Sequence, residues 1–274
     1  MNSIKESLKG NLPPGIMQSL RNGKNALRRT GDLPAIYFHP WRINSNRRLK
    51  EYQDRYKGKR CFIIGNGPSL KKTDLSFLKN EFTFGMNRVY LAFEEWGFQT
   101  SFLVSVNNLV IEQCQDEFQD LFLPKFFSWR SRKLLFPEGN PDEQTHFLDT
   151  TYTGEKFANQ LHTRFWEGGT VTYICLQLAF CMGFQEVYLI GVDHSFETKG
   201  AANKTVISSG DDPNHFSPEY FGKGFRWQLP DLETSEKAYR LANFVYQEDG
   251  RKVFDATVGG KLDIFQKIDY LTIF

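Results

Sequence analysis

The sequence predicts an α/β fold: a doubly wound, mainly parallel sheet with helices on both faces and a lid-like insertion. Three observations lead to this prediction. Short apolar runs alternate with helical segments along the chain, an order typical of parallel sheets whose helices cross back over the strands. Glycine or asparagine follows several of these runs. With 274 residues, 40% of them hydrophobic and 15% aromatic, the chain can fill the core of one large domain or two small ones.

The first predicted strand covers residues 61–64, a run too short and too β-branched for a helix and typical of a strand buried on both faces. It leads into the turn Gly65-Asn66-Gly67-Pro68-Ser69-Leu70. Gly65 and Gly67 let the backbone bend sharply and leave room for a ligand to reach main-chain N–H groups, which suits nucleotide phosphates or ribose. The spacing matches neither the dinucleotide fingerprint nor the P-loop, and such a motif alone is as often a plain turn.

A second stretch strengthens the nucleotide interpretation. Gly168-Gly169-Thr170 precedes a nearly all-apolar helix predicted over 171–182, followed by an apolar strand over 187–190 and then by Gly191-Val192-Asp193. Thr170 is a good helix cap. Because the helix and the strand are both apolar, Asp193 is predicted at the carboxyl end of a central parallel strand, where ligands of such sheets bind.

The remaining elements alternate in the same way. Strands are predicted over 82–86, 101–105, 125–128, 145–147 and 252–255, and helices over 46–56, 88–96, 110–122, 232–246 and after Gly259-Gly260, with a basic loop over 130–140 and no clear period over 149–166. Residues 4–29 have a helical pattern interrupted by prolines. We therefore divide the chain into a basic helical extension, 1–57, and a nucleotide-binding domain, 58–274. A weakly periodic segment over about 194–230 predicts a lid.

Asparagine recurs at the ends of three predicted strands, as Asn66, Asn87 and Asn107. Side-chain amides at these positions can read a base or a ribose through paired donors and acceptors. The alternative is that asparagine only tolerates the backbone angles of loops.

Charge is unevenly distributed along the chain. Residues 1–60 contain 14 Lys and Arg against 4 Asp and Glu, a net charge of +10, and the remaining residues carry −8. This pattern predicts either contact with an anionic membrane or a charged acceptor through residues 1–60, or a solvated basic arm packed on the catalytic domain. No nucleic-acid partner is expected, and a homo-oligomer is compatible with the sequence.

Cysteine usage and hydropathy bear on the compartment. The four cysteines lie in or near apolar runs without a C-x-x-C pair, so neither a zinc site nor a disulfide framework is expected. There is no apolar run of about 18 residues and no signal-peptide core. We expect a cytoplasmic protein, with peripheral contact at the inner face of the membrane left open.

In order and spacing these segments resemble a superfamily of Rossmann-like transferases. It contains bacterial sialyltransferases that use CMP-sialic acid and 6-hydroxymethylpterin diphosphokinase (MptE-like) domains. The resemblance covers about residues 59–265 and rests on Gly65-Asn66-Gly67-Pro68-Ser69-Leu70, Met86-Asn87, Gly169-Thr170, Gly183-Phe184, residues 187–193, Asn214-His215-Phe216, and Ala256-Thr257 with Gly259-Gly260.

The sialyltransferase branch implies a glycosyltransferase that moves a sugar from a CMP-linked donor to a surface glycan and requires no cofactor. Asn66, Asn87, Asn107 and Thr170 are similar to residues that hold the CMP portion, and His215 resembles the general base that takes the proton of the acceptor hydroxyl. The resemblance thus implies nucleotide binding by Gly65, Asn66, Gly67, Ser69, Asn87, Asn107, Gly169, Thr170 and Asp193, and catalysis by His215 and Asp193.

The chain departs from the sialyltransferases at His194-Ser195-Phe196, where they place a tyrosine that stabilises the departing phosphate. This departure leaves the identity of the nucleotide open. The pterin branch implies instead an ATP-dependent diphosphokinase of a pterin-like alcohol, with Mg²⁺ held by Asp193 and by Asp211 or Asp212. A third alternative is a non-catalytic nucleotide-binding module.

The other histidines receive plainer interpretations. His39 and His162 are expected to be core or surface residues in aromatic surroundings. His146 follows a polar loop and is predicted to be exposed. His194, beside Asp193, is left open between a structural and a functional role.

Overall fold

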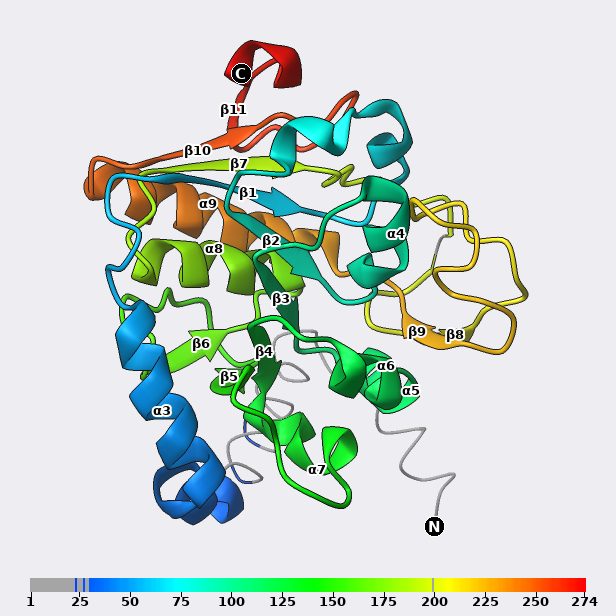
Figure 1. Cartoon of the computed structure of the whole chain (residues 1–274). Helices are drawn as coiled ribbons and strands as arrows, with labels where there is room; N and C mark the ends of the chain where they lie inside the picture. Colours follow the sequence, from blue (N-terminus) through cyan, green and yellow to red (C-terminus); the bar gives the residue numbers. More distant parts are fainter. Residues whose placement is uncertain (1–22, 24–26, 28–29, 199) are drawn as a thin grey trace.

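The structure, a computed structural model, describes residues 23, 27, 30–198 and 200–274, so the predicted helix over 4–29 lies almost entirely outside the described residues. Within the described part of the chain, nine strands form one sheet in which every neighbouring pair is parallel (Figure 1). The strands are β1 (Arg60–Ile64), β2 (Thr83–Met86), β3 (Phe102–Ser105), β4 (Lys125–Ser128), β5 (Thr145–Thr151), β6 (Arg164–Trp166), β7 (Glu186–Ile190), β10 (Lys252–Asp255) and β11 (Gln266–Lys267), in the spatial order β11-β10-β7-β1-β2-β3-β4-β5-β6.

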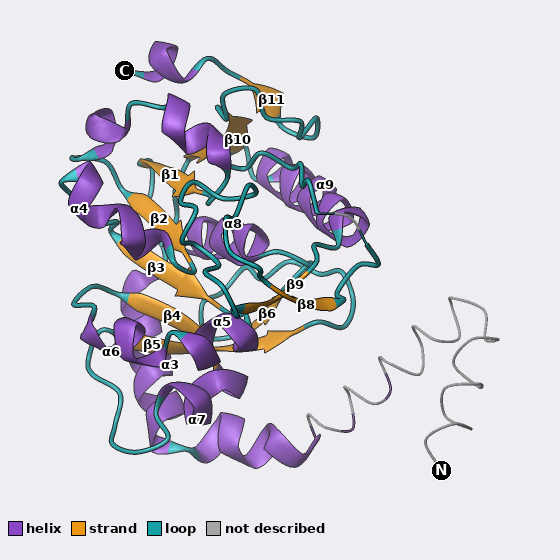
Figure 2. Cartoon of the chain, turned by 90° about the vertical axis from the view of Figure 1, so that its right-hand side faces the viewer, coloured by secondary structure: helices purple, strands orange, loops and turns teal. Residues whose placement is uncertain are grey.

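Helices cover both faces of the sheet (Figures 1 and 2). One face packs against α3 (Pro40–Tyr52), α8 (Val171–Cys181) and α9 (Leu232–Glu248). The other packs against the shorter helices α4 (Phe93–Trp96), α5 (Asn108–Gln113), α6 (Gln115–Asp120) and α7 (Arg132–Leu135). The doubly wound, mainly parallel α/β fold is therefore confirmed.

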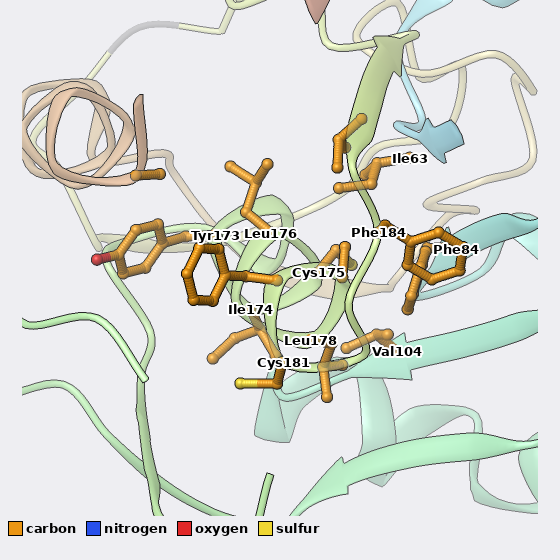
Figure 3. Packing of buried hydrophobic residues seen from close by; sticks show 14 of the residues in the cluster. Ile63, Phe84, Val104, Tyr173, Ile174, Cys175, Leu176, Leu178, Cys181 and Phe184 are labelled. Carbon is orange, nitrogen blue, oxygen red and sulfur yellow. The ribbon is translucent and has the colours of Figure 1, made fainter. Parts of the chain in front are cut away.

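Two hydrophobic cores, one on each face, explain why the strands are apolar without alternation. Ile63, Phe84 and Val104 of the central strands face α8, as Figure 3 shows, whereas Phe62 and Ile64 point into the core on the other face. Since successive side chains of a strand point to opposite faces, a strand covered on both faces needs apolar residues at every position. The nearly all-apolar α8 lies between the sheet and α9.

The predicted strands differ from the structure where polar residues interrupt the apolar pattern. β5 continues to Thr151, and the stretch after it, which shows no period in the sequence, contains β6. The Arg164 guanidinium on β6 donates to the carboxylate of Asp149 on β5 at 3.0 Å. Such pairs satisfy buried polar groups and conceal the apolar pattern of an ordinary strand.

Other differences concern helix boundaries. The helix predicted over 110–122 is two helices that meet at Cys114, and the one over 88–96 is a 3₁₀ turn followed by α4. The loop predicted over 130–140 contains α7. The helix predicted after Gly259-Gly260 is wrong: that segment forms β11 and the 3₁₀ turn Tyr270–Ile273, and Phe274 stacks on Phe62 at 5.7 Å.

The segment over 194–230, predicted as a lid, carries an antiparallel hairpin of β8 (Thr205–Ile207) and β9 (Arg226–Gln228). It lies beside α5 at the right of Figure 1. The Gln113 side-chain amide in α5 donates to the Arg226 carbonyl and accepts from the Arg226 N–H, each at 2.9 Å, so a side chain of α5 fixes the hairpin to the sheet domain.

The helix α3, inside the predicted extension 1–57, packs directly on β5. Leu49 of α3 is fully buried, and the Phe147 N–H of β5 donates to the Ser45 hydroxyl at 3.0 Å. The division of the chain at residue 57 stays a prediction. Among the described residues, no helix combines the length and the apolarity needed to cross a bilayer.

Candidate functional site

A cavity of about 230 Å³ opens at the carboxyl ends of β1, β2 and β7. In the sheet β1 lies between β2 and β7. The strands that follow β1 in sequence, β2 to β6, lie on one side of it, whereas β7 and the later strands of the sheet lie on the other. Such a reversal opens a crevice between strand-end loops, where doubly wound sheets bind their ligands. The predicted site residues that line this cavity are Gly65, Asn66, Gly67, Asn87, Asn107, Gly169, Thr170, Asp193 and His215.

The turn after β1 is pressed against the end of β7. The Gly65 N–H donates to the Ile190 carbonyl at 2.7 Å, and the Gly67 N–H donates to the Gly191 carbonyl at 2.9 Å. A Cβ atom on Gly65 would lie 2.1 Å from the Gly191 oxygen, and one on Gly67 would lie 1.8 Å from an Asp193 carboxylate oxygen. The close approach of the end of β7 and of the Asp193 side chain therefore requires glycine at both positions.

The Asp193 side chain holds this turn in place through two hydrogen bonds. Its Oδ1 accepts from the Ser69 N–H at 3.1 Å and its Oδ2 accepts from the Ser69 hydroxyl at 2.7 Å. Ser69 does not line the cavity and lies behind it in this contact. The carboxylate of Asp193 thus holds the 3₁₀ turn Pro68–Lys72 against the end of β7, while roles of Asp193 and Ser69 toward a nucleotide stay predictions.

The three strand-end amides differ in how much of their hydrogen-bonding capacity remains for a ligand. The Asn66 Nδ2 donates to the Met86 carbonyl at 3.1 Å, and its Oδ1 is buried without a partner in the described residues. The Asn87 Oδ1 accepts from the Ser105 hydroxyl at 3.0 Å. The Asn107 Oδ1 caps α5 by accepting from the Leu109 N–H at 2.9 Å.

The N-terminus of α8 forms one wall of the cavity. Gly168 and Gly169 both have positive φ, 53° and 73°, a conformation that glycine adopts without strain. Thr170 follows as the N-cap and accepts from the Thr172 N–H at 3.3 Å. The positive end of the dipole of this buried helix is suited to a phosphate group.

His215 enters the cavity from the lid. Its Nδ1 lies 2.6 Å from the Asp212 Oδ2, and its ring stacks on Tyr220 with 4.0 Å between centroids and 8° between planes. Phe221 contacts the same ring edge-on at 4.8 Å. The Phe216 N–H donates to the Asn66 carbonyl at 2.8 Å, so the backbone beside His215 is tied to the turn after β1.

His194 also lines the cavity, after the end of β7. Its backbone has a φ of 53°, uncommon for a residue with a side chain, and its Nε2 lies 3.0 Å from the Glu236 Oε1 on α9. The hydrogen bond to His194 lowers the pKa of Glu236. The structure thus places a paired imidazole in the cavity wall after the end of β7.

Two of the carboxylates assigned to Mg²⁺ in the diphosphokinase alternative, Asp193 and Asp212, have hydrogen-bond partners in the protein. Both oxygens of Asp193 accept from Ser69, and Asp212 accepts from the Asn214 N–H as well as contacting His215. No group of three or more His, Cys, Asp and Glu side chains in the described part of the chain is arranged to hold a metal ion. A requirement for Mg²⁺, and its assignment to Asp193 with Asp211 or Asp212, stay predictions.

Sequence reasoning missed the partners of both histidines. Asp212 and His215 are three residues apart, a spacing that could have suggested the pair inside one turn. Glu236 is 42 residues from His194, and only the packing of α9 brings the two together. His146 was predicted to be exposed, which is wrong: it is 2% exposed within β5.

The parallel sheet, with a cavity of strand-end loops and a lid at the reversal of strand order, defines a Rossmann-like α/β protein. The family described as 6-hydroxymethylpterin diphosphokinase MptE-like matches residues 41–199, more than half of the chain, and the chain belongs to this family. The match ends before the lid residues Asp212 and His215.

The chain resembles the solved structure of the MAf glycosyltransferase from Magnetospirillum magneticum AMB-1 with 16% identity and a TM-score of 0.46. The alignment covers 83% of this chain and 38% of that one, so the chain spans little more than a third of that protein's length. No curated protein matches the sequence.

Proposed function

We propose that the chain is a nucleotide-sugar-dependent glycosyltransferase, similar to the sialyltransferases, with a CMP-linked donor and a surface glycan as acceptor. The observation that carries this proposal is the arrangement of His215 in the lid, paired with Asp212 and open to the cavity where Asn66 and the N-terminus of α8 lie. A base and a nucleotide site in one cavity are what transfer to a hydroxyl requires.

In this proposal the nucleotide lies along the ends of β1 and β2. Its phosphate faces the first turn of α8, where the helix dipole favours negative charge. Asn66 supplies a buried acceptor to the base or ribose, and Asn87 contributes its amide N–H₂ from the neighbouring strand end. His215 takes the proton of the acceptor hydroxyl as that oxygen attacks the anomeric carbon and the nucleotide leaves.

The family match favours a second candidate, an ATP-dependent diphosphokinase of a pterin-like alcohol. That reaction also begins with deprotonation of a hydroxyl beside a nucleotide, so the same histidine serves both proposals. They differ in the nucleotide and in the bond broken: the anomeric C–O bond of a nucleotide sugar in the first, and a P–O bond of ATP in the second.

Thermal unfolding in the presence of CMP, CDP, UDP, GDP and ATP, each with and without Mg²⁺, tests the nucleotide class. A ligand present at 100 times its dissociation constant stabilises the fold by about 2.7 kcal/mol. Stabilisation by cytidine nucleotides without Mg²⁺ supports the glycosyltransferase, and stabilisation by ATP with Mg²⁺ alone supports the diphosphokinase.

The released nucleotide separates the two reactions. Incubation with a CMP-sugar and a glycan acceptor is expected to release CMP, whereas a diphosphokinase supplied with ATP and a hydroxymethylpterin releases AMP. Nucleotide binding without release of either product supports the non-catalytic module and contradicts both enzyme proposals.

A further inference from the structure

The ring nitrogens of His146 and His215 differ in their hydrogen-bond partners, and the difference shows how the lid holds His215. His146 is buried in β5 with both ring nitrogens lacking a hydrogen-bond partner among the described residues. His215 has one nitrogen bound to Asp212, while its Nε2 has no described partner and is not among the buried atoms left unpaired. The lid therefore fixes one nitrogen of His215 and leaves the other without a partner among the described residues, in a side chain that lines the cavity.

We propose that Asp212 is a positioning residue: it accepts a hydrogen bond from the His215 Nδ1–H and so keeps the Nε2 lone pair available as the base. This inference rests on the proposed function and assigns the device that makes His215 competent for it. The hydrogen bond at one imidazole nitrogen decides which tautomer the neutral ring adopts. An acceptor at 2.6 Å from Nδ1 selects the tautomer whose Nε2 is unprotonated.

Asp212 is itself held in place without help from the histidine. Its side chain is 4% exposed, its Oδ1 accepts from the Asn214 N–H at 3.0 Å, and its own N–H donates to the Pro218 carbonyl at 3.2 Å. The Asp212 carboxylate therefore has a fixed position, and the imidazole of His215 orients toward it. A group that is positioned before the substrate binds costs no reorganisation during the reaction.

The ring has little freedom to turn away from this acceptor. Tyr220, which is 1% exposed, lies flat against one face of the imidazole, and Phe221 contacts the ring edge-on. Arg88, at the end of β2, donates from its guanidinium to the Tyr220 carbonyl and from its backbone N–H to the Tyr220 hydroxyl. Through Tyr220, the ring of His215 is therefore held in a fixed orientation relative to the end of β2, which also carries Asn87.

The proton balance of the step follows from this geometry. The acceptor O–H bond breaks and its proton goes to Nε2, a C–O bond forms to the anomeric carbon, and the bond from that carbon to the phosphate breaks as the nucleotide leaves. His215 then carries a proton on each nitrogen, and the Asp212 carboxylate offsets the positive charge. Water takes the proton from Nε2 when the product departs.

The test uses the full chain with ¹⁵N-labelled histidine, above pH about 8 where an ordinary imidazole is neutral. We expect the ¹⁵N shifts of His215, assigned by comparison with His215→Ala, to show a protonated Nδ1 and an unprotonated Nε2, and Asp212→Asn to shift the ring toward the Nε2–H tautomer. Glu219→Gln, an exposed lid carboxylate whose side chain has no described partner, is the matched control. A wild-type His215 with its proton on Nε2 would overturn the inference.

Kinetics provide the second measurement. Asp212→Asn should lower kcat by about 10²- to 10⁴-fold and leave the KM for the donor nearly unchanged, because the carboxylate acts on the base and not on the nucleotide. Glu219→Gln should retain the wild-type kcat. The same kcat in both variants would contradict the proposal. The tautomer is read without substrate, so failure to find glycosyl transfer would leave the NMR result standing and would count against the proposed function alone.

Discussion

At the scale of single residues, Asn66 is the side chain whose surroundings point most directly to a ligand. Its amide donates to Met86, yet its Oδ1 is buried beside the cavity without a partner in the described residues. A buried acceptor that lacks a donor costs about 1 to 3 kcal/mol. A nucleotide N–H or O–H at this oxygen would recover that energy, whereas a turn-forming role alone leaves the cost unexplained.

We expect Asn66→Ala and Asn87→Ala each to weaken nucleotide binding by about 1 to 3 kcal/mol, since each removes an amide from the cavity wall. Isothermal titration with the nucleotide that stabilises the wild type measures the change. Asn80→Ala, at an exposed position between β1 and β2, is the control. Unchanged affinity in both cavity variants would return these residues to the status of turn formers.

His215→Ala should lower kcat by about 10²- to 10⁴-fold while nucleotide affinity stays nearly constant, because a general base acts in the transition state and not on donor binding. His162→Ala, at an exposed position, is expected to behave as wild type. Loss of donor affinity together with rate would instead indicate that His215 only orders the lid.

At the scale of elements, β5 contains a histidine, His146, whose protonation in the folded protein is energetically unfavourable. His146 lies against the rings of Tyr52 at 5.5 Å and Phe126 at 5.1 Å, which places it between α3 and the sheet. Burial, and then the positive charge of Arg48, lower its pKa to about 3 from an ordinary value of 6.5. The folded protein therefore holds this ring neutral at acidities where the unfolded chain protonates it.

The sign of the resulting pH dependence follows from linkage. Between pH 6.5 and about 3 the unfolded state binds one more proton than the folded state, so stability falls as the pH decreases through this range. At pH 5 this amounts to about 2 kcal/mol. His146→Phe should remove that part of the loss, measured as the difference in unfolding free energy between pH 8 and pH 5 by urea titration. His162→Gln is the control, and an unchanged pH dependence in His146→Phe would be evidence against a buried neutral His146.

At the scale of the whole molecule, the uneven distribution of charge along the chain has no role in the proposed reaction. Residues 1–60 carry +10 and the rest of the chain −8. Within the described part of this segment, Tyr37 and Phe38 are 63% and 77% exposed. Exposed aromatic side chains beside a basic segment are a combination found on surfaces that contact anionic lipid.

We therefore propose that residues 1–60 bring the enzyme to an anionic membrane. Sedimentation with phosphatidylserine vesicles should show binding at low salt that weakens as salt screens the charges. Replacement of Arg21, Lys24, Arg28 and Arg29 by glutamine should reduce binding, whereas the same change at the exposed Lys71, Lys72, Lys79 and Lys133 should not. Absent binding at low salt, or binding indifferent to salt, would refute the proposal.

Local patterns in the sequence determined six of the nine strands of the sheet. Apolar runs place β1, β2, β3, β4, β7 and β10 within a residue or so, because strands buried on both faces are largely apolar. The same runs place Asn66, Asn87 and Asp193 at strand ends, and parallel strands necessarily bring those ends to one edge.

Only the tertiary structure decided which of these groups have partners. The Asp193 carboxylate is bound by Ser69, 124 residues away, and His194 is paired with a glutamate of α9. The burial of His146 comes from the packing of α3 over β5, which no pattern around residue 146 predicts. Hydrogen-bond partners and burial depend on contacts between residues far apart in the chain, whereas the periodicity of a strand or helix is a property of its own residues.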